Sequence, residues 1–170
     1  AWYYVWAEKV GVGKQISNLY IARMESPTKL ATVQVLLTTP DYSWERGEFW
    51  VDEGPAVIRH EDRLWLTFSA SDTGPSYCVG LMSADADDDL LDPLSWHKER
   101  EPFLASAPAL GLYGPGHNSF TTDEGGNDIM VFHARPTDHI VTDDPLYDDS
   151  RSTYLAPLKW DADGRPLLEL

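Results

Sequence analysis

The sequence contains a single cysteine, Cys78, and this scarcity excludes two kinds of scaffold. One cysteine cannot form a disulfide within the chain, and it cannot build a zinc site from several thiolates. Because Cys78 lies inside an apolar run, we expect a buried thiol rather than a nucleophile.

Basic residues are also scarce. Lys and Arg together number 13 against 28 Asp and Glu, which gives a formal net charge of −15. A surface of this charge repels polyanions, so neither nucleic acid nor an anionic membrane surface is an expected partner.

Long apolar runs are missing as well. No stretch reaches the about 18 consecutive apolar residues of a transmembrane helix. Residues 1–6 have no basic residue before their apolar run and no small-residue cleavage site, so we expect no signal peptide, and no cellular location is indicated. The Gly11-Val12-Gly13 stretch lacks the third glycine of a dinucleotide-binding fingerprint.

What the sequence does have is short apolar and aromatic runs, separated by clusters of Gly, Pro, Asp and Asn. This pattern predicts β-strands almost throughout. The one helix candidate, residues 86–96, is rich in Asp and contains Pro93, which favours a loop or a single turn. The fold class is therefore all-β.

Three of the expected strands resemble one another, and they recur at a regular interval. They are residues 2–8, 64–70 and 129–135, whose starts are 62 and 65 residues apart. A second strand follows each, a fourth outer strand closes each unit, and a first strand precedes the second and third copies. Four antiparallel strands repeated at a fixed period are typical of a β-propeller blade, whereas a β-sandwich gives no reason for the period.

The predicted architecture is a single partial propeller domain over residues 1–170, with blade-like units at approximately 1–40, 54–100 and 117–170. At roughly 63 residues per unit the chain supplies two and a half to three blades, while closed propellers need about four or more. An open blade leaves apolar surface uncovered, so we expect a homo-oligomer or a complementary propeller half as partner.

Two polar residues stand where the first strands of complete units begin, near the expected propeller axis. Glu53 precedes Gly54-Pro55 and follows the aromatic pair Phe49-Trp50, which favours a proton donor, although a carboxylate that caps a turn fits equally. His117 has the corresponding place in the next unit, as an inward-facing imidazole or a structural one. Arg135 ends the middle strand of that unit and can bind sugar hydroxyls or pair with an acid.

Several stretches resemble glycoside hydrolase family 43, in particular its exo-acting α-L-arabinofuranosidases, and the similarity covers essentially the whole chain. The stretches that carry it are Val51-Asp-Glu-Gly-Pro-Ala-Val-Ile58, Leu66-Thr-Phe-Ser-Ala-Ser71, Tyr77-Cys-Val-Gly-Leu81, Tyr113-Gly-Pro-Gly-His-Asn-Ser-Phe120, Val131-Phe-His-Ala-Arg135, Asp144-Pro-Leu-Tyr-Asp148 and Trp160-Asp-Ala-Asp-Gly164. The resemblance implies a five-bladed propeller that hydrolyses glycosidic bonds of arabinose- or xylose-containing carbohydrates with inversion.

The resemblance also assigns roles to residues. Glu53 matches the family's general acid, and His117 matches an axial histidine that binds calcium or its water in related members. Arg135 is expected to line the sugar subsite. Further substrate-binding residues are expected at these positions: Phe49, Trp50, Ser71 and Asn118.

Departures from the family pattern leave a second function open. The family's general base and its pKa-tuning aspartate have no counterpart in residues 1–170, and Asp52 replaces an asparagine, which adds a charge beside the acid. Either the sequence is a fragment of an intact enzyme, or another chain or copy completes the ring and provides a base from a non-homologous position such as Asp72, Asp143 or Asp144. The alternative is a non-catalytic carbohydrate-binding or assembly module.

Overall fold

The structure is a computed structural model that describes residues 1–11 and 16–170, so the Gly11–Gly13 stretch lies partly outside the described residues. Its strands are β1 (Trp2–Val10), β2 (Ile16–Ser26), β3 (Lys29–Leu30), β4 (Val35–Thr38), β5 (Trp50–His60), β6 (Arg63–Ala70), β7 (Cys78–Asp85), β8 (His97–Lys98), β9 (Tyr113–Thr122), β10 (Asp128–Arg135), β11 (Ser152–Trp160) and β12 (Pro166–Leu168). The all-β prediction is confirmed.

The helical content of the described residues consists of short 3-10 turns. They are η1 (Ser43–Glu45), η2 (Pro93–Ser95), η3 (Pro108–Leu110) and η4 (Pro145–Tyr147). The expected turn within residues 86–96 is η2, where the Asp92 side chain accepts a hydrogen bond from the backbone N–H of Leu94. None of these described helices has the length or apolar content needed to cross a bilayer.

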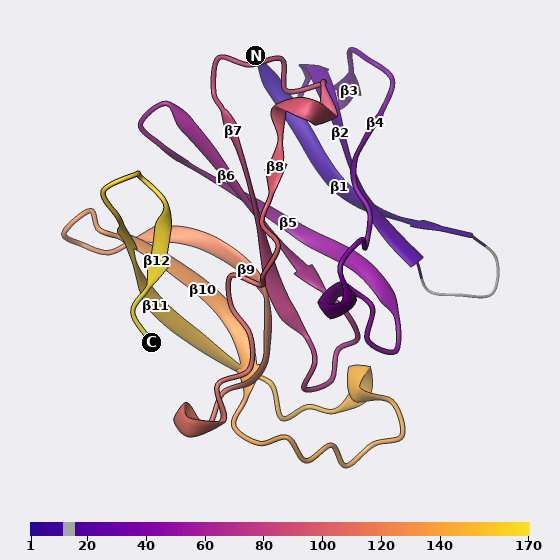
Figure 1. The fold of residues 1–170 in the computed structure, drawn as a ribbon, viewed down its shortest axis with the longest axis vertical. Helices are drawn as coiled ribbons and strands as arrows, with labels where there is room; N and C mark the ends of the chain where they lie inside the picture. Colours follow the sequence, from indigo (N-terminus) through magenta and orange to yellow (C-terminus); the bar gives the residue numbers. More distant parts are fainter. Residues whose placement is uncertain (12–15) are drawn as a thin grey trace.

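The strands form three groups that fan out in chain order (Figure 1). Strands β5 to β8 pair antiparallel in sequence order, and so do β9 to β12. The first group contains β1 and β2, with β3 and β4 on the other edge of β2. A short parallel contact between β2 and β5 joins this group to the second one. The arrangement is part of a β-propeller, as predicted, with a blade that lacks its first strand followed by two complete blades.

Apolar side chains fill the spaces between neighbouring blades. The first cluster joins β2 to β6 and β7 through buried residues such as Leu19, Phe68 and Met82. The second joins β7 to the last blade through Val79, Met130 and other side chains of β10 and β11. Because a fully buried large apolar side chain stabilises a fold by about 1.5–3 kcal/mol, these inter-blade clusters fix how the blades sit beside one another.

The side of β5 that carries Asp52 faces away from that of Glu53 and contains a buried ion cluster. Lys98 Nζ forms an ion pair with Glu45, lies 3.4 Å from Asp52 Oδ2, and donates to the Thr39 carbonyl at 2.8 Å. Burial raises the pKa of Asp52 to about 8, against the opposing effect of Lys98. The expectation that Asp52 adds a charge beside the acid is therefore wrong, because adjacent residues of a strand point to opposite faces.

This cluster predicts a pH-dependent stability difference for Asp52→Asn. In the unfolded chain the carboxyl ionises near its ordinary pKa of 3.8, whereas the folded protein holds the proton to about 8. Between these values the folded state binds a proton that the unfolded state has lost, so stability falls as pH rises. Thermal unfolding should show a larger gain for Asp52→Asn at about pH 8 than at about pH 5. Asp87→Asn, at an exposed loop position, is the control. An equal gain in stability for Asp52→Asn at both pH values would contradict the raised pKa of Asp52.

Candidate active site

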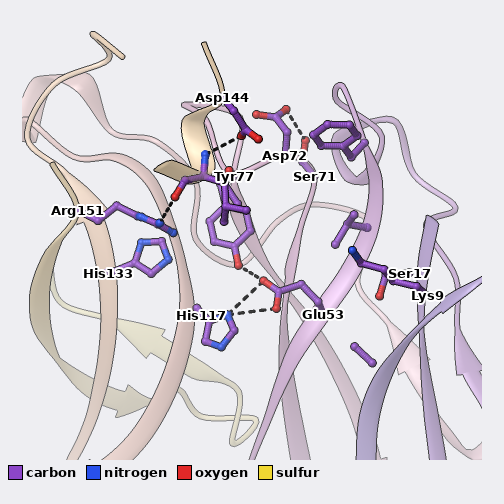
Figure 2. A pocket seen from close by; sticks show the side chains of 15 residues that line it. Lys9, Ser17, Glu53, Ser71, Asp72, Tyr77, His117, His133, Asp144 and Arg151 are labelled. Carbon is purple, nitrogen blue, oxygen red and sulfur yellow. Dashed lines mark hydrogen bonds and ion pairs between the residues drawn. The ribbon is translucent and has the colours of Figure 1, made fainter. Parts of the chain in front are cut away.

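A cavity of about 650 Å³ opens where the three blades meet, and Figure 2 shows the side chains around it. Strands β1, β2 and β5, the loop after β6, strands β9 and β10 and the loop between β10 and β11 all contribute. The lining residues are Ala7, Lys9, Ser17, Phe49, Val51, Glu53, Ser71, Asp72, Thr73, Tyr77, His117, His133, Asp144, Leu146 and Arg151.

Glu53 and His117, from neighbouring blades, meet in this cavity. His117 Nδ1 is 3.1 Å from Glu53 Oε2 and 3.3 Å from Oε1. The hydroxyl of Tyr77 also hydrogen bonds to Glu53 Oε1 (Figure 2). The Glu53 side chain is 26% exposed and that of His117 is 60% exposed, so the carboxyl is half-buried at the base of an accessible site.

The backbone at both residues has a conformation that brings them this close. His117 has a φ of 50°, in the left-handed region that few side chains adopt, and Gly54 has a φ of 56°. A Cβ at position 54 would lie 3.1 Å from His117 Nδ1 and would press on the imidazole, while the positive φ itself favours glycine. The backbone N–H of His117 donates to Ser69 Oγ at 2.6 Å, which ties β9 to the neighbouring blade.

The electrostatics of the two histidines differ. The hydrogen bond to Glu53 raises the pKa of His117, although burial acts in the opposite direction. For His133, burial lowers the pKa to about 4, and the positive charge of Arg151 adds to that effect. At neutral pH the cavity therefore has a neutral His133 opposite a His117 whose charged form is stabilised by its contact with Glu53.

Two predicted subsite residues line the cavity and two others do not. Phe49 and Ser71 are lining residues. Asn118 is buried and donates to Thr67 Oγ1 at 2.9 Å, and the Trp50 ring has the Arg46 guanidinium above it at 5.1 Å. Both follow a residue that faces the cavity, and their side chains point to the opposite side of the strand.

Arg135 also lies outside the cavity, which corrects the expectation that it lines a sugar subsite. Its side chain is fully buried and donates to the carbonyls of Thr73 at 2.6 Å and Pro145 at 2.7 Å. Its Nε is 3.5 Å from Asp148 Oδ1. Hydrogen bonds from Ser150 hold the pKa of Asp148 well below its ordinary value, so this carboxylate stays charged beside the guanidinium. Arg135 thus joins the two loops that carry Asp72 and Asp144 to the cavity.

Sequence reasoning missed several residues that the structure brings to the cavity. Tyr77 is 2% exposed, and burial raises its pKa well above the ordinary value. Arg151 approaches from the last blade and donates to the Leu146 carbonyl at 2.8 Å. His133 alternates along β10 with buried apolar residues, and this periodicity was the one sequence signal that could have placed it on the cavity side. Tyr77 and Arg151 lie just outside strands, where no periodicity indicates direction.

The carboxylates proposed as substitutes for the base are only partly in place. Asp72 and Asp144 line the cavity, whereas Asp143 is exposed on the loop. Burial alone would raise the pKa of Asp72, but hydrogen bonds from Ser76 and from backbone N–H groups outweigh it and lower the pKa. The Asp144 side chain accepts from the N–H of Leu146 at 2.9 Å, at the start of η4. Both carboxylates thus have a structural role in holding loops.

The calcium expected near His117 stays a prediction. Calcium takes about six to eight oxygen ligands, whereas His117 offers a nitrogen that contacts Glu53. Across residues 1–11 and 16–170, no group of three or more His, Cys, Asp or Glu side chains is arranged to hold a metal ion.

Comparisons with known proteins agree with this architecture. The family model described as glycosyl hydrolases family 43 matches residues 1–166. An α-L-arabinofuranosidase of known structure from Lactobacillus brevis superposes with a TM-score of 0.91 and 47% sequence identity, over 96% of this chain and 50% of that one. A thermostable family-43 glycoside hydrolase gives a TM-score of 0.79 at 27% identity, over 99% of this chain and 53% of that chain.

Curated relatives are similar at the level of sequence. An extracellular exo-α-(1→5)-L-arabinofuranosidase from Streptomyces avermitilis is 43% identical over 162 residues, 95% of this chain and 34% of that protein. An α-L-arabinofuranosidase from Humicola insolens is 43% identical over 166 residues, 96% of this chain and 34% of that protein. This chain spans about a third of the length of these relatives. Because the family model matches residues 1–166 of this chain, the chain belongs to glycosyl hydrolases family 43.

Proposed function

We propose that the protein carrying this chain hydrolyses O-glycosidic bonds in arabinose- or xylose-containing carbohydrates, with Glu53 as the general acid. The observation that carries the proposal is the half-buried Glu53 carboxyl, held by Tyr77 and His117 at the base of a cavity between blades. Among the sugars, arabinofuranose is favoured because the relatives at 43–47% identity are named arabinofuranosidases.

The proposed reaction inverts the anomeric centre. The Glu53 carboxyl gives its proton to the glycosidic oxygen as the bond from that oxygen to the anomeric carbon breaks. A second carboxylate takes a proton from the water that attacks the opposite face of the sugar. Around the acid, Phe49 and Val51 offer apolar contact to the sugar ring, while Lys9 and Arg151 provide donors for its hydroxyl groups.

The second carboxylate is proposed to come from a part of the propeller beyond residues 1–170. Asp72 accepts hydrogen bonds from Gly74 N at 2.8 Å and from the Ser76 hydroxyl, and Asp144 accepts from Leu146 N. The hydrogen bonds to Asp72 lower its pKa, so this carboxylate is a poor proton acceptor, and Asp144 is engaged in holding the start of η4. The remaining blades, whether from further polypeptide or from a second copy, would complete the ring and supply the base.

The test is hydrolysis by the complete polypeptide that carries these residues, with aryl α-L-arabinofuranosides and aryl β-D-xylosides as substrates. We expect the arabinofuranoside to be the better substrate, and proton NMR of the first-formed sugar to show the inverted anomer. Retention would contradict the proposed mechanism, and an absence of turnover with both sugars would contradict the proposed activity.

A second candidate function is a non-catalytic carbohydrate-binding module. It is favoured by the engagement of Asp72 and Asp144 with their own loops, which leaves the described residues without an evident base. Titration calorimetry with arabino-oligosaccharides separates the two functions: binding without turnover would support the module and exclude the hydrolase.

A further inference from the structure

Two buried hydroxyl groups, those of Ser69 and Tyr77, connect the His117 backbone to the surroundings of the Glu53 carboxyl. The backbone N–H of His117 can only donate, and it does so to Ser69 Oγ at 2.6 Å. The Tyr77 hydroxyl has Ser69 beside it and hydrogen bonds to Glu53 Oε1. An ionised carboxylate can only accept, so Tyr77 donates to Glu53 in that state, and the Ser69 hydroxyl keeps a proton that it can offer to Tyr77.

Both hydroxyl groups are shielded from water. Ser69 is fully buried, and Tyr77 is 2% exposed. A buried hydroxyl that loses its partner carries the full desolvation penalty, so the bond from Tyr77 to the carboxyl is favoured over any alternative orientation. Chains of this kind also strengthen one another in a low-dielectric interior. The Glu53 carboxyl is therefore held at Oε1.

The ring that carries the Tyr77 hydroxyl has little freedom to move. It stacks on His133 with ring centroids 5.5 Å apart and planes 4° from parallel. Its edge lies against Gly116, where a Cβ would be 2.1 Å from Tyr77 Cε1. Gly114 makes a similar close approach to Gly74, whose carbonyl accepts the Tyr77 N–H at 3.1 Å. Gly114 and Gly116 of β9 thus leave the space that the Tyr77 ring and its turn occupy.

We propose that Tyr77 is a positioning residue for Glu53, supported by Ser69, and that it fixes the orientation of the carboxyl through Oε1. His117 Nδ1 lies 3.1 Å from the other oxygen, Oε2, so Tyr77 and His117 together set the plane of the carboxyl. The O–H bond of the Glu53 carboxyl breaks as the proton moves to the glycosidic oxygen, and the carboxylate that remains keeps the Tyr77 bond. This inference rests on the proposed role of Glu53 as the general acid.

The test compares Tyr77→Phe on two aryl arabinofuranosides in the complete polypeptide. This variant keeps the ring that packs on His133 and Gly116 and removes only the hydroxyl. A phenyl leaving group needs a proton in the transition state, whereas 2,4-dinitrophenolate departs without one. A misdirected acid should lower kcat/KM for the phenyl substrate by about 10²-fold. The 2,4-dinitrophenyl substrate should change by less than about 3-fold, because it needs no general acid.

Controls keep each outcome decisive. Ser69→Ala should give the same selectivity with a smaller loss, and it replaces Tyr77→Phe if that variant does not fold. Tyr154→Phe, whose ring stacks on Phe132 away from the cavity, should change neither substrate. If Glu53→Gln is selective for the phenyl substrate and Tyr77→Phe is not, the positioning role is overturned while the acid stands. If Glu53→Gln is itself not selective, the proposed function falls.

Discussion

Replacing Glu53 with glutamine is expected to lower kcat/KM for phenyl α-L-arabinofuranoside by about 10²–10⁴-fold in the complete polypeptide, because the amide cannot donate a proton as a carboxylic acid does. The substitution is nearly isosteric, and its amide can accept the Tyr77 hydrogen bond and contact His117. The melting temperature should therefore change little. Steady-state kinetics alongside thermal unfolding separates the loss of the acid from a loss of folded protein.

Asp72 provides a matched control for this prediction. Like Glu53 it lines the cavity and accepts hydrogen bonds. Asp72→Asn removes a charge from the same cavity but disturbs the loop that holds it, since Gly74 and Ser76 both donate to this carboxylate. We expect Asp72→Asn to reduce stability more than Glu53→Gln does. It should reduce kcat/KM by the same factor for the phenyl and the 2,4-dinitrophenyl arabinofuranoside. Similar rates for Glu53→Gln and the unmodified protein would remove Glu53 from the mechanism.

Replacing Arg135 with methionine is expected to destabilise the fold strongly. Its guanidinium, fully buried, donates to two backbone carbonyls and lies against Asp148. Methionine fills much of the same volume but leaves those acceptors without a donor, and loss of one member of a buried ion pair costs about 3–5 kcal/mol. Equilibrium unfolding in guanidinium chloride should show a lower midpoint and a free energy of unfolding that is smaller by about this amount.

Arg165→Met provides the comparison, because it removes the same group from a more exposed pair. Arg165 donates to both carboxylate oxygens of Glu99 at 2.8 and 2.7 Å, and its side chain is 35% exposed. Pairs of this kind contribute at most about 1 kcal/mol. If Arg135→Met were no more destabilising than Arg165→Met, Arg135 would not be the link between the two loops.

The blade pattern could be predicted from sequence because three similar strands recur at intervals of 62 and 65 residues, with turn residues between the strands. The similarity of β6 and β10 placed both strands in equivalent positions of their blades. The strands before them, which carry Glu53 and His117, were therefore expected to begin near the same axis, and the two side chains do meet in one cavity. The alternation of side-chain direction along β5 and β9 shows why Asp52, Trp50 and Asn118 do not face the cavity. Each is adjacent to a cavity residue, and in a strand adjacency means the opposite face.

Arg135 was out of reach of such reasoning for a different reason. Simple alternation along β10 would put it on the same face as His133, which does line the cavity. The pairing of β10 with β9 shifts register between His133 and Arg135, so the strand turns and the guanidinium enters the space between two loops. Tyr77 was missed because it precedes β7, where the turn at Gly74 rather than a strand period decides its direction.

The most direct measurement of the central claim is a crystal structure of the Glu53→Gln variant of the complete polypeptide with an arabino-oligosaccharide bound. We predict that the sugar lies in the cavity between the blades and that its glycosidic oxygen is within hydrogen-bond distance of the residue 53 side chain. A sugar bound elsewhere, or one whose glycosidic oxygen faces away from residue 53, would contradict the account.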